Sequence, residues 1–417
     1  DEPTIEAMNL MGLDYNGVGN HEFDRGLAHL RRLQSGARFR MLAANVLEGG
    51  NTVFPPYGIK DFGGTKVAFV GMTLRATPAI LSPRARAGLE FRDEVETVAA
   101  LVPELERQGV SAIVVLIHQG GIAGADANGC DNPWGPIFEL APKFHPMVRV
   151  VVSAHTHQAY VCRVGDRLVT SAGSYGRYVT EIALSADGSS RATNHPVRAD
   201  LPADRAQSEL LAHYGKLYEP FERVVGRLSA PLPREANADG ESPLGRVMAD
   251  AQLEATRGAG AVVAFMNRGG IRAPLQPAAD GTITYADLYA AHPFGNTLVT
   301  MPLTGAQIIR MLELQWTDET RIMPVSRGFS YAWDPARPTG SRVVPGSVTI
   351  GGKVLEPDAV YRVTLNDYVA NGGDGLAMLR AVRERTQGGR LLEALGQYLE
   401  RNQPLAPPQD RRVQRID

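Results

Sequence analysis

Two short stretches, far apart in the chain, carry the residue types best suited to chemistry. Residues 19–24 read GNHEFD, and residues 155–157 read HTH. Amide oxygens and imidazole nitrogens both bind divalent metal ions, and each stretch follows an apolar run of strand length. The pattern favours a metal site that hydrolyses phosphate esters, because bound metal ions activate water and stabilise the charge that develops on phosphoryl oxygens.

The elements that must position these groups are strands that end at the same side of a sheet. Apolar runs over residues 112–117 and 148–152 predict buried strands, and metal-competent histidines directly follow both of them. In layered α/β folds, ligand sites gather outside the carboxyl ends of strands. We therefore expect one metal site from an amide and three imidazoles: Asn20, His118, His155 and His157.

His21 and Asp24 are three residues apart, a spacing that lets a carboxylate orient an imidazole. A histidine held in this way is suited to donate a proton to a leaving-group oxygen. The pair is therefore predicted to be catalytic. The other histidines are interpreted as surface or core residues: His29, His145, His195, His213 and His292.

Three segments in the second half of the chain have the composition of a nucleotide pocket. Residues 267–272 (NRGGIR) join paired glycines to a guanidinium, and residues 293–296 (PFGN) place an aromatic ring beside an amide. Residues 366–375 add a second ring and a carboxylate suited to ribose hydroxyls. A base stacked between two rings gains ~1–3 kcal/mol, so the rings would form a clamp. The alternative is structural, since glycine pairs are common in turns and a phenylalanine is common in a core.

The composition excludes several classes of protein. The chain has 417 residues, 44% hydrophobic and 21% charged, as in soluble globular proteins of two or three domains. The net charge of −2 gives no electrostatic case for binding nucleic acid. No run approaches the ~20 apolar residues of a membrane span, and the first residues lack the basic and apolar regions of a signal peptide.

The chain contains two cysteines, Cys130 and Cys162, which lack the spacing of a zinc site. They are either two buried thiols or a disulfide. A disulfide would fit an oxidising compartment. The sequence leaves these two alternatives open.

Alternating strand-like and helix-like segments predict an α/β layered fold with two domains. Helices are expected over residues 4–11, 93–108, 203–222 and 244–256, and from a cap at Thr304 to about residue 315. Strands are expected over residues 41–45, 67–72, 112–117, 148–152, 262–266 and 360–365. The expected division is a first domain over residues 1–202, a linker helix over 203–226 and a second domain over 227–417.

The motifs in combination resemble those of calcineurin-like metallophosphoesterases, and more narrowly the 5′-nucleotidase/UDP-sugar hydrolase family. They are GNHEFD, His118 followed by QGG, and AHTH at residues 154–157, and the resemblance covers essentially the whole chain. It implies a metallophosphoesterase αββα sandwich followed by a C-terminal α/β substrate-binding domain. It also implies that Asn20, His118 and His155 ligate one metal ion, that His157 ligates another, and that His21 with Asp24 forms the catalytic dyad.

The same resemblance extends to the second domain, where a set of residues matches the substrate-binding motifs of the family. Tyr368 stands where phenylalanine is common in the family, which keeps the stacking face and adds a hydroxyl. The implied substrate-binding residues are Arg246, Asn267, Arg272, Phe294, Asn296, Tyr368 and Asp374.

The sequence departs from the family pattern at its start. The opening Asp-x-His and the following Gly-Asp of the family have no counterpart, and Ala154 stands where glycine is usual. We therefore expect a sandwich that is N-terminally truncated, with two divalent metal ions such as zinc or manganese in the full-length form and one in this chain.

The resemblance implies hydrolysis of nucleotide phosphate esters such as AMP, and it leaves UDP-sugars and 2′,3′-cyclic nucleotides as further substrates. The alternative is a non-catalytic nucleotide-binding protein, because part of the dimetal site is missing. The family further implies a periplasmic or cell-surface location. Neither nucleic acid nor a membrane span is expected, and the sequence leaves the oligomeric state open.

Overall fold

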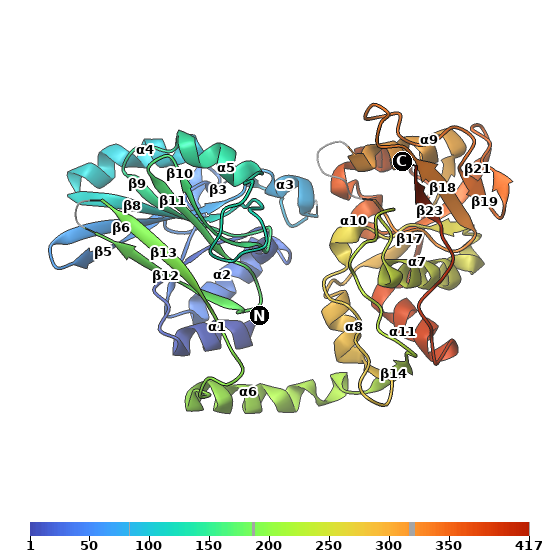
Figure 1. The fold of residues 1–417 in the computed structure, drawn as a ribbon, viewed down its shortest axis with the longest axis horizontal. Coiled ribbons are helices and arrows are strands. Elements are labelled where there is room, and N and C mark those ends of the chain that lie inside the picture. Colours follow the sequence, from blue (N-terminus) through green and yellow to red (C-terminus); the bar gives the residue numbers. More distant parts are fainter. Residues whose placement is uncertain (83, 186–187, 317–321, 417) are drawn as a thin grey trace. The chain divides into compact units, whose positions relative to one another are not determined.

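A computed structural model of the chain describes residues 1–82, 84–185, 188–316 and 322–416 (Figure 1). The chain forms two compact units, Asp1–Tyr214 and Gly215–Asp417. The boundary falls within helix α6 (Arg205–Tyr218), inside the segment for which a linker helix is expected. Each unit has hydrophobic clusters of its own.

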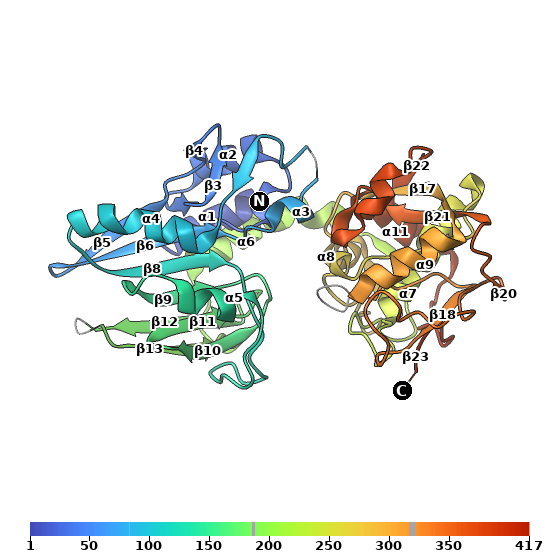
Figure 2. The same cartoon turned by 90° about the horizontal axis from the view of Figure 1, so that it is seen from above.

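The first unit is built around a six-stranded sheet with the order β10-β11-β9-β8-β6-β5 (Figure 2). The strands β11, β9, β8 and β6 run parallel, and the two edge strands run antiparallel to their neighbours. The bounds are β5 Tyr57–Phe62, β6 Thr65–Thr73, β8 Val110–His118, β9 Val148–Ser153, β10 Ala159–Val164 and β11 Arg167–Ala172. The apolar runs thus form buried parallel strands, as the sequence predicts.

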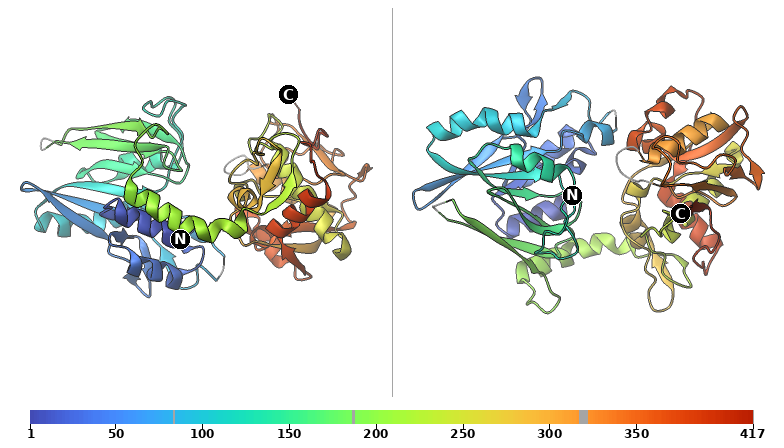
Figure 3. Two further views of the ribbon diagram at one scale, coloured as in Figure 1. Left: turned by 90° about the horizontal axis from the view of Figure 1, so that it is seen from below. Right: turned by 45° about the horizontal axis from the view of Figure 1, so that its top comes forward.

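Smaller strand groups and helices surround this sheet (Figure 3). The strands are β1 Tyr15–Gly17 paired with β2 Arg40–Leu42, β3 Val46–Glu48 between β4 Asn51–Thr52 and β7 Leu89–Phe91, and the hairpin β12 Tyr178–Leu184 with β13 Ser190–Pro196. The helices are α1 Glu2–Leu10, α2 Leu27–Gly36, α3 Thr77–Ile80, α4 Glu94–Arg107 and α5 Pro136–Leu140. The mixed layers agree with the predicted α/β fold.

The β1–β2 pair lies directly against the large sheet because glycines occupy the contact points. A Cβ atom on Gly17 would lie 2.7 Å from the carbonyl oxygen of Leu116 in β8. One on Gly71 of β6 would lie 2.3 Å from the carbonyl oxygen of Leu42. The two backbones can approach this closely only without side chains, so the glycines set the position of the chain that leaves β1.

Helix α4 forms where its sequence predicts. The Asp93 side chain accepts hydrogen bonds from the backbone of Val95 and Glu96, which caps the first turn. Val98, Val102 and Leu105 are buried against the core of the sheet. The helix packs on β6 and β8 and ends before Gly109, whose φ is 75°.

The two cysteines form a disulfide, which resolves the alternatives that the sequence leaves open. The Cα atoms of Cys130 and Cys162 are 5.1 Å apart, and 32 positions separate the residues in the chain. Cys162 lies in β10, and Cys130 lies in the long loop after β8. The bond therefore anchors that loop to the edge of the sheet.

The second unit contains two four-stranded sheets with the orders β15-β21-β17-β22 and β20-β19-β18-β23, and a pair β14-β16. The strands are β14 Val224–Arg227, β15 Val263–Ala264, β16 Thr282–Thr284, β17 Thr297–Thr304, β18 Phe329–Trp333, β19 Thr349–Ile350, β20 Lys353–Val354, β21 Val360–Asn366, β22 Thr386–Arg390 and β23 Val413–Arg415. The helices are α7 Pro243–Thr256, α8 Tyr285–Ala291, α9 Gly305–Glu313, α10 Asp367–Ala370 and α11 Leu391–Arg401.

In this unit one expected helix begins where it is predicted, and one expected strand is shorter than predicted. Thr304 caps α9 in a capping box with Gln307, as its position predicts. The strand expected over residues 262–266 is shorter in the structure, because Met266 donates its backbone hydrogen bond to Pro324 instead of to β21. The chain leaves the sheet at that point.

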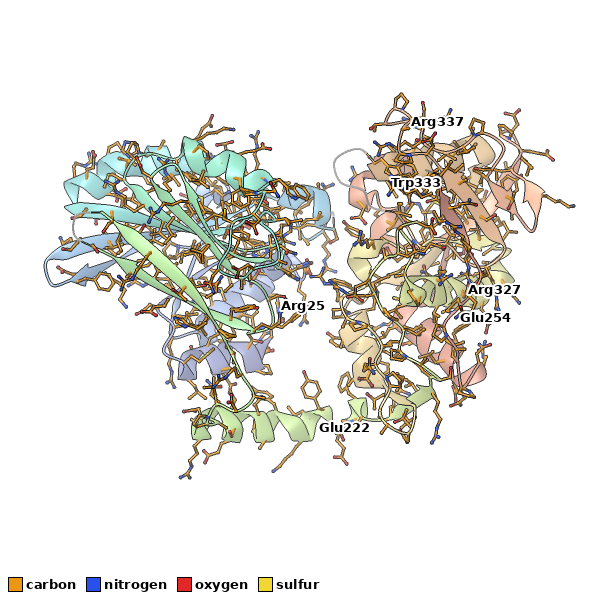
Figure 4. All side chains as sticks on the ribbon, viewed as in Figure 1. Arg25, Glu222, Glu254, Arg327, Trp333 and Arg337 are labelled. Carbon is orange, nitrogen blue, oxygen red and sulfur yellow. A yellow bond between two sulfur atoms is a disulfide. The ribbon has the colours of Figure 1, made fainter. Side chains whose placement is uncertain are left out.

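A clasp made of Arg412 and Asp250 ties the C-terminal segment to α7. Both side chains are about 5% exposed or less, and two guanidinium nitrogens donate to the two carboxylate oxygens at 2.8 and 2.9 Å. A buried, bidentate pair of this kind is costly to break, because either partner alone would be an uncompensated buried charge. On the outside of α7, Glu254 pairs with Arg327 at 3.3 Å (Figure 4).

We predict that reduction of the disulfide lowers the free energy of unfolding by about 2–4 kcal/mol, since the bond restricts the unfolded chain. Urea denaturation with and without dithiothreitol measures the change. A Cys130→Ser variant is the control and should be insensitive to the reductant. Equal stability of the oxidised and reduced protein would contradict this role of the bond.

Candidate functional site

The parallel strands of the first unit bring the predicted groups to one edge of the sheet. The register pairs Thr73 with His118 and Ile117 with Ser153, so β6, β8 and β9 end together. The Thr73 hydroxyl donates a 2.6 Å hydrogen bond to the carbonyl of Val18, which ties the end of β1 to the same edge. The loops after β1, β8 and β9 therefore lie side by side.

At this edge, His118 and His155 meet with their ring centroids 5.1 Å apart and the rings steeply inclined. The chain at Gly19 passes directly beside them, since a Cβ atom there would lie 2.7 Å from Nδ1 of His118. The next residue, Asn20, is 1% exposed. Its Oδ1 atom is buried and makes no hydrogen bond within the described part of the chain. A buried acceptor without a partner costs about 1–3 kcal/mol, unless a bound group supplies the missing interaction.

The electrostatics of His118 favour its metal-binding form. Burial, followed by the positive charge that His155, His21 and His157 would carry, lowers the pKa of His118 to about 3. The imidazole is therefore neutral near pH 7, as a ligand must be. The same interactions show that these four histidines, predicted from separate stretches of sequence, lie close enough to influence one another.

The backbone that carries His155 and His157 is strained. Their φ angles are 71° and 58°, in the left-handed region that residues other than glycine seldom adopt. Such residues cost on the order of 1–3 kcal/mol each, so the surrounding chain must hold them. The Thr156 hydroxyl donates to the carbonyl of Gly121 at 2.7 Å, and a Cβ atom on Gly120 would lie 2.2 Å from the carbonyl oxygen of Ala154. The loop after β8 thus fixes the loop after β9.

The predicted dyad is in contact. Nδ1 of His21 lies 2.8 Å from Oδ2 of Asp24, and both side chains are roughly half exposed. Glu22, between them, accepts a 3.0 Å hydrogen bond from the backbone of Gly19, and burial raises the pKa of this carboxyl group. Glu22 belongs to the GNHEFD motif, but the motif alone predicts no role for this carboxyl group.

A candidate donor set for one metal ion must include an amide oxygen. No group of three or more His, Cys, Asp or Glu side chains that could hold a metal ion occurs among the residues with described positions. The candidate set is mixed, and it would combine the buried, unpartnered oxygen of Asn20 with the imidazoles of His118 and His155. His157 contacts the ring of Tyr175, with centroids 5.8 Å apart. No motif or spacing pointed to Tyr175, which lies on the loop after β11.

In the second unit, three loops meet at one edge of the β15-β21-β17-β22 sheet. β15 and β21 are parallel and end there, and the antiparallel β17 begins there. The guanidinium carbon of Arg272 lies 6.0 Å from the centre of the Phe294 ring. The hydroxyl of Tyr368 donates to Asp374 at 3.0 Å, and Asp374 has a φ of 51°. Four predicted pocket residues therefore form two contacting pairs.

Two predicted asparagines are tied to the end of β21. Asn366 donates to Oδ1 of Asn267 at 2.7 Å, and the amide of Asn296 donates to Asp367 at 2.7 Å. These bonds hold the loops before β17 and after β15 against the central strand. The side chains of Asn267 and Asn296 therefore hold this edge of the sheet together.

Arg246 has a different environment from the other predicted pocket residues. It lies on α7, and its guanidinium donates to the carbonyl oxygens of Pro408 and Asp410. The hydrogen bonds that the structure describes for its side chain thus hold the C-terminal segment. No local pattern pointed to this partner, which follows more than 160 positions later.

Comparison with protein-family models gives a match for the second unit. Residues 224–381 match the model described as "5'-nucleotidase, C-terminal domain". This range contains all seven residues predicted to bind substrate. It includes the three loops that meet at the sheet edge.

Among curated proteins, Endonuclease YhcR of Bacillus subtilis is 30% identical over 398 residues, which cover 89% of this chain. The chain spans only 31% of the length of that relative. The 5′-nucleotidase of Vibrio cholerae is 26% identical over 453 aligned positions, which cover 97% of this chain and 79% of the relative.

Among solved structures, the 5′-nucleotidase precursor of Thermus thermophilus superposes with a TM-score of 0.85 at 29% identity. The superposition covers all of this chain and 86% of that one. Three observations point to the same group of proteins. They are the motifs of the first unit, the matched domain of the second unit and the fold shared with a solved 5′-nucleotidase precursor. The second unit thus matches a 5′-nucleotidase C-terminal domain, and the whole chain is similar in sequence and fold to 5′-nucleotidases.

Proposed function

We propose that the protein is a metal-dependent hydrolase of nucleotide phosphate esters that acts on nucleoside 5′-monophosphates such as AMP. The observation that carries this proposal is the buried, unpartnered oxygen of Asn20, the residue after Gly19, whose backbone passes beside His118 of the His118–His155 pair. The names of the Vibrio cholerae and Thermus thermophilus relatives support the substrate class.

Asn20, His118 and His155 would hold one divalent cation such as zinc or manganese, and His157 would ligate a second one. A bound ion of this kind lowers the pKa of water and offsets charge on phosphoryl oxygens. The contribution of the protein is preorganisation. The imidazole of His118 is neutral, and the backbones at His155 and His157 are held in the left-handed region, so these side chains would need little reorganisation to bind an ion.

The His21–Asp24 pair would supply the proton. Oδ2 of Asp24 lies 2.8 Å from Nδ1 of His21, and this contact would orient the imidazole ring. Nε2 of the imidazolium would then donate its proton to the ribose oxygen as the ester bond breaks. Both side chains are about half exposed, which gives a substrate access to them.

The second unit would bind the nucleoside. Phe294 and Tyr368 would stack on the base, Asp374 would accept hydrogen bonds from ribose hydroxyls, and Arg272 would contact an anionic or polar group. Asn267 and Asn296 would keep these loops in place. Arg246 would act at this site only indirectly, through the C-terminal segment that it holds.

The range of substrates within this class is part of the proposal. UDP-sugars and 2′,3′-cyclic nucleotides are further candidates, and one relative is named as an endonuclease. A periplasmic or cell-surface location is proposed from the family and is supported by the disulfide, which persists in oxidising compartments. None of the helices in the described segments is long and apolar enough to cross a membrane.

We predict that the protein releases phosphate from AMP in the presence of Mn²⁺ and that EDTA abolishes this activity. Asn20→Ala should lower the affinity for Mn²⁺ on the order of 10- to 100-fold, because a ligand oxygen is lost. Calorimetric titration with Mn²⁺ measures the affinity, and the exposed Asn51→Ala serves as the matched control. Tight AMP binding without hydrolysis would indicate the alternative, a non-catalytic nucleotide-binding protein.

His21→Ala should reduce kcat for AMP about 10²- to 10⁴-fold, because the proton donor is lost. Its metal content, measured by mass spectrometry of the purified protein, should equal that of the wild type. His213→Ala, at an exposed position of α6, is the control. Loss of bound metal in the His21 variant would refute its assignment as proton donor.

Tyr368→Ala should raise KM for AMP by the equivalent of ~1–3 kcal/mol, the contribution of one stacked ring. Hydrolysis of p-nitrophenyl phosphate, which has no base to stack, should keep its kinetic constants. Steady-state kinetics with both esters tests the difference, and the exposed Tyr289→Ala is the control. An unchanged KM for AMP would rule out the ring clamp.

A further inference from the structure

A fully buried histidine lies against the Phe294 ring, which we propose as a stacking face. His292 is 0% exposed and follows the last residue of α8. Its backbone N–H closes the helix by donating to Leu288 at 2.9 Å. It is the one histidine of the second unit, and the proposed function gives it no role.

Two hydrogen bonds join this position to the turn that carries Arg272. Nδ1 of His292 lies 2.7 Å from the carbonyl oxygen of Gly270, and the backbone N–H of Arg272 donates to Ala291 at 2.8 Å. Because a carbonyl oxygen only accepts, the proton of the imidazole must sit on Nδ1. The turn itself is tightly packed, since a Cβ atom on Gly270 would lie 2.7 Å from the side chain of Met266.

The same imidazole contacts the proposed stacking ring. The rings of His292 and Phe294 meet edge to face, with centroids 5.3 Å apart and planes inclined by 69°. Arg272 lies over the Phe294 ring at 6.0 Å. One buried side chain therefore fixes both members of the Arg272–Phe294 pair, one through a hydrogen bond to its turn and the other through ring contact.

The second ring nitrogen shows that this arrangement has a cost. Nε2 of His292 is buried and has no hydrogen-bond partner in the described chain. Burial lowers the pKa of His292, so the ring stays neutral and keeps Nδ1 as its only donor. A phenylalanine of similar size would avoid the unpaired nitrogen but would lose the bond to Gly270. The bond to the turn is thus what the imidazole supplies and an apolar ring cannot.

We propose that His292 is a positioning residue that determines affinity for the nucleoside part of the substrate by fixing Phe294 and the turn before Arg272. The inference rests on the proposed function, because it assumes that Phe294 and Arg272 contact the nucleotide. His292 itself would touch neither the base nor the reacting atoms.

Two variants separate the hydrogen bond from the ring. His292→Phe keeps an aromatic ring and removes the donor to Gly270. His292→Asn keeps a donor near the place of Nδ1 and removes the ring. We expect His292→Phe to weaken AMP binding about tenfold, equivalent to ~1.4 kcal/mol, and His292→Asn to recover part of this loss. Calorimetry of AMP binding and the KM for AMP report this effect.

p-Nitrophenyl phosphate separates this role from general damage to the fold. Its kcat/KM should stay within about twofold of wild type in both variants, because it has no nucleoside to bind. Gln315→Leu is the matched control, a buried residue of the same unit whose amide donates to Leu312 at 2.9 Å. It should lower the melting temperature and leave the Kd for AMP unchanged.

Each outcome decides one of the two proposals. If AMP and p-nitrophenyl phosphate are affected equally, or if Gln315→Leu weakens AMP binding to the same degree, His292 has only a structural role. A wild-type protein that binds AMP and hydrolyses neither ester defeats the proposed function, and the Kd values of the variants then decide the role of His292. A wild-type protein that does not bind AMP overturns the inference.

Discussion

The parallel hydrogen-bond ladder of β6, β8 and β9 is the constraint on which the candidate site depends. Parallel register makes the three strands end at one edge, so that Thr73 pairs with His118 and Ile117 with Ser153 although 45 and 36 positions separate them in the sequence. Two glycines bring the loop after β1 to the same edge. Because Gly17 and Gly71 have no side chains, the backbone of the β1–β2 pair packs directly against the backbone of the sheet. A side chain at either glycine would separate the β1–β2 pair from the sheet and displace the chain that leads to Asn20.

The site carries costs that the rest of the unit must offset. Asn20 has an unpartnered buried oxygen within the described chain, His118 is desolvated, and His155 and His157 have left-handed backbones. Each departs from what folding alone would favour, and all lie at the same edge. The buried strands of the sheet stabilise the unit. The hydrogen bond from Thr156 to Gly121 holds the strained loop against the loop after β8.

Much of the framework could be predicted from sequence, since it follows from local rules. The apolar runs predicted β8 and β9, Thr304 indicated the start of α9, and spacing predicted the His21–Asp24 contact. The remainder depends on tertiary contacts between distant segments that no local pattern encodes. The partners of Arg246 and the left-handed backbone at His155 are of this kind.

The partners of buried side chains also could not be predicted from the sequence, as His292 shows. The interpretation of His292 as a surface or core residue leaves its full burial open, and it says nothing of the carbonyl or the ring that the imidazole contacts. The choice between free thiols and a disulfide likewise required the distance between Cys130 and Cys162. Composition identifies such groups, and only packing reveals their partners.

The clasp between Arg412 and Asp250 also bears on how the protein is made. β23 pairs with β18, and Arg412 neutralises a carboxylate of α7 that is otherwise enclosed by the core. During synthesis on the ribosome, the second unit therefore lacks a strand and a counter-ion until its final residues emerge. The last strand that the structure describes in the first unit, β13, ends at Pro196. During translation the second unit should therefore complete its fold later than the first, once Arg412 and β23 have been synthesised.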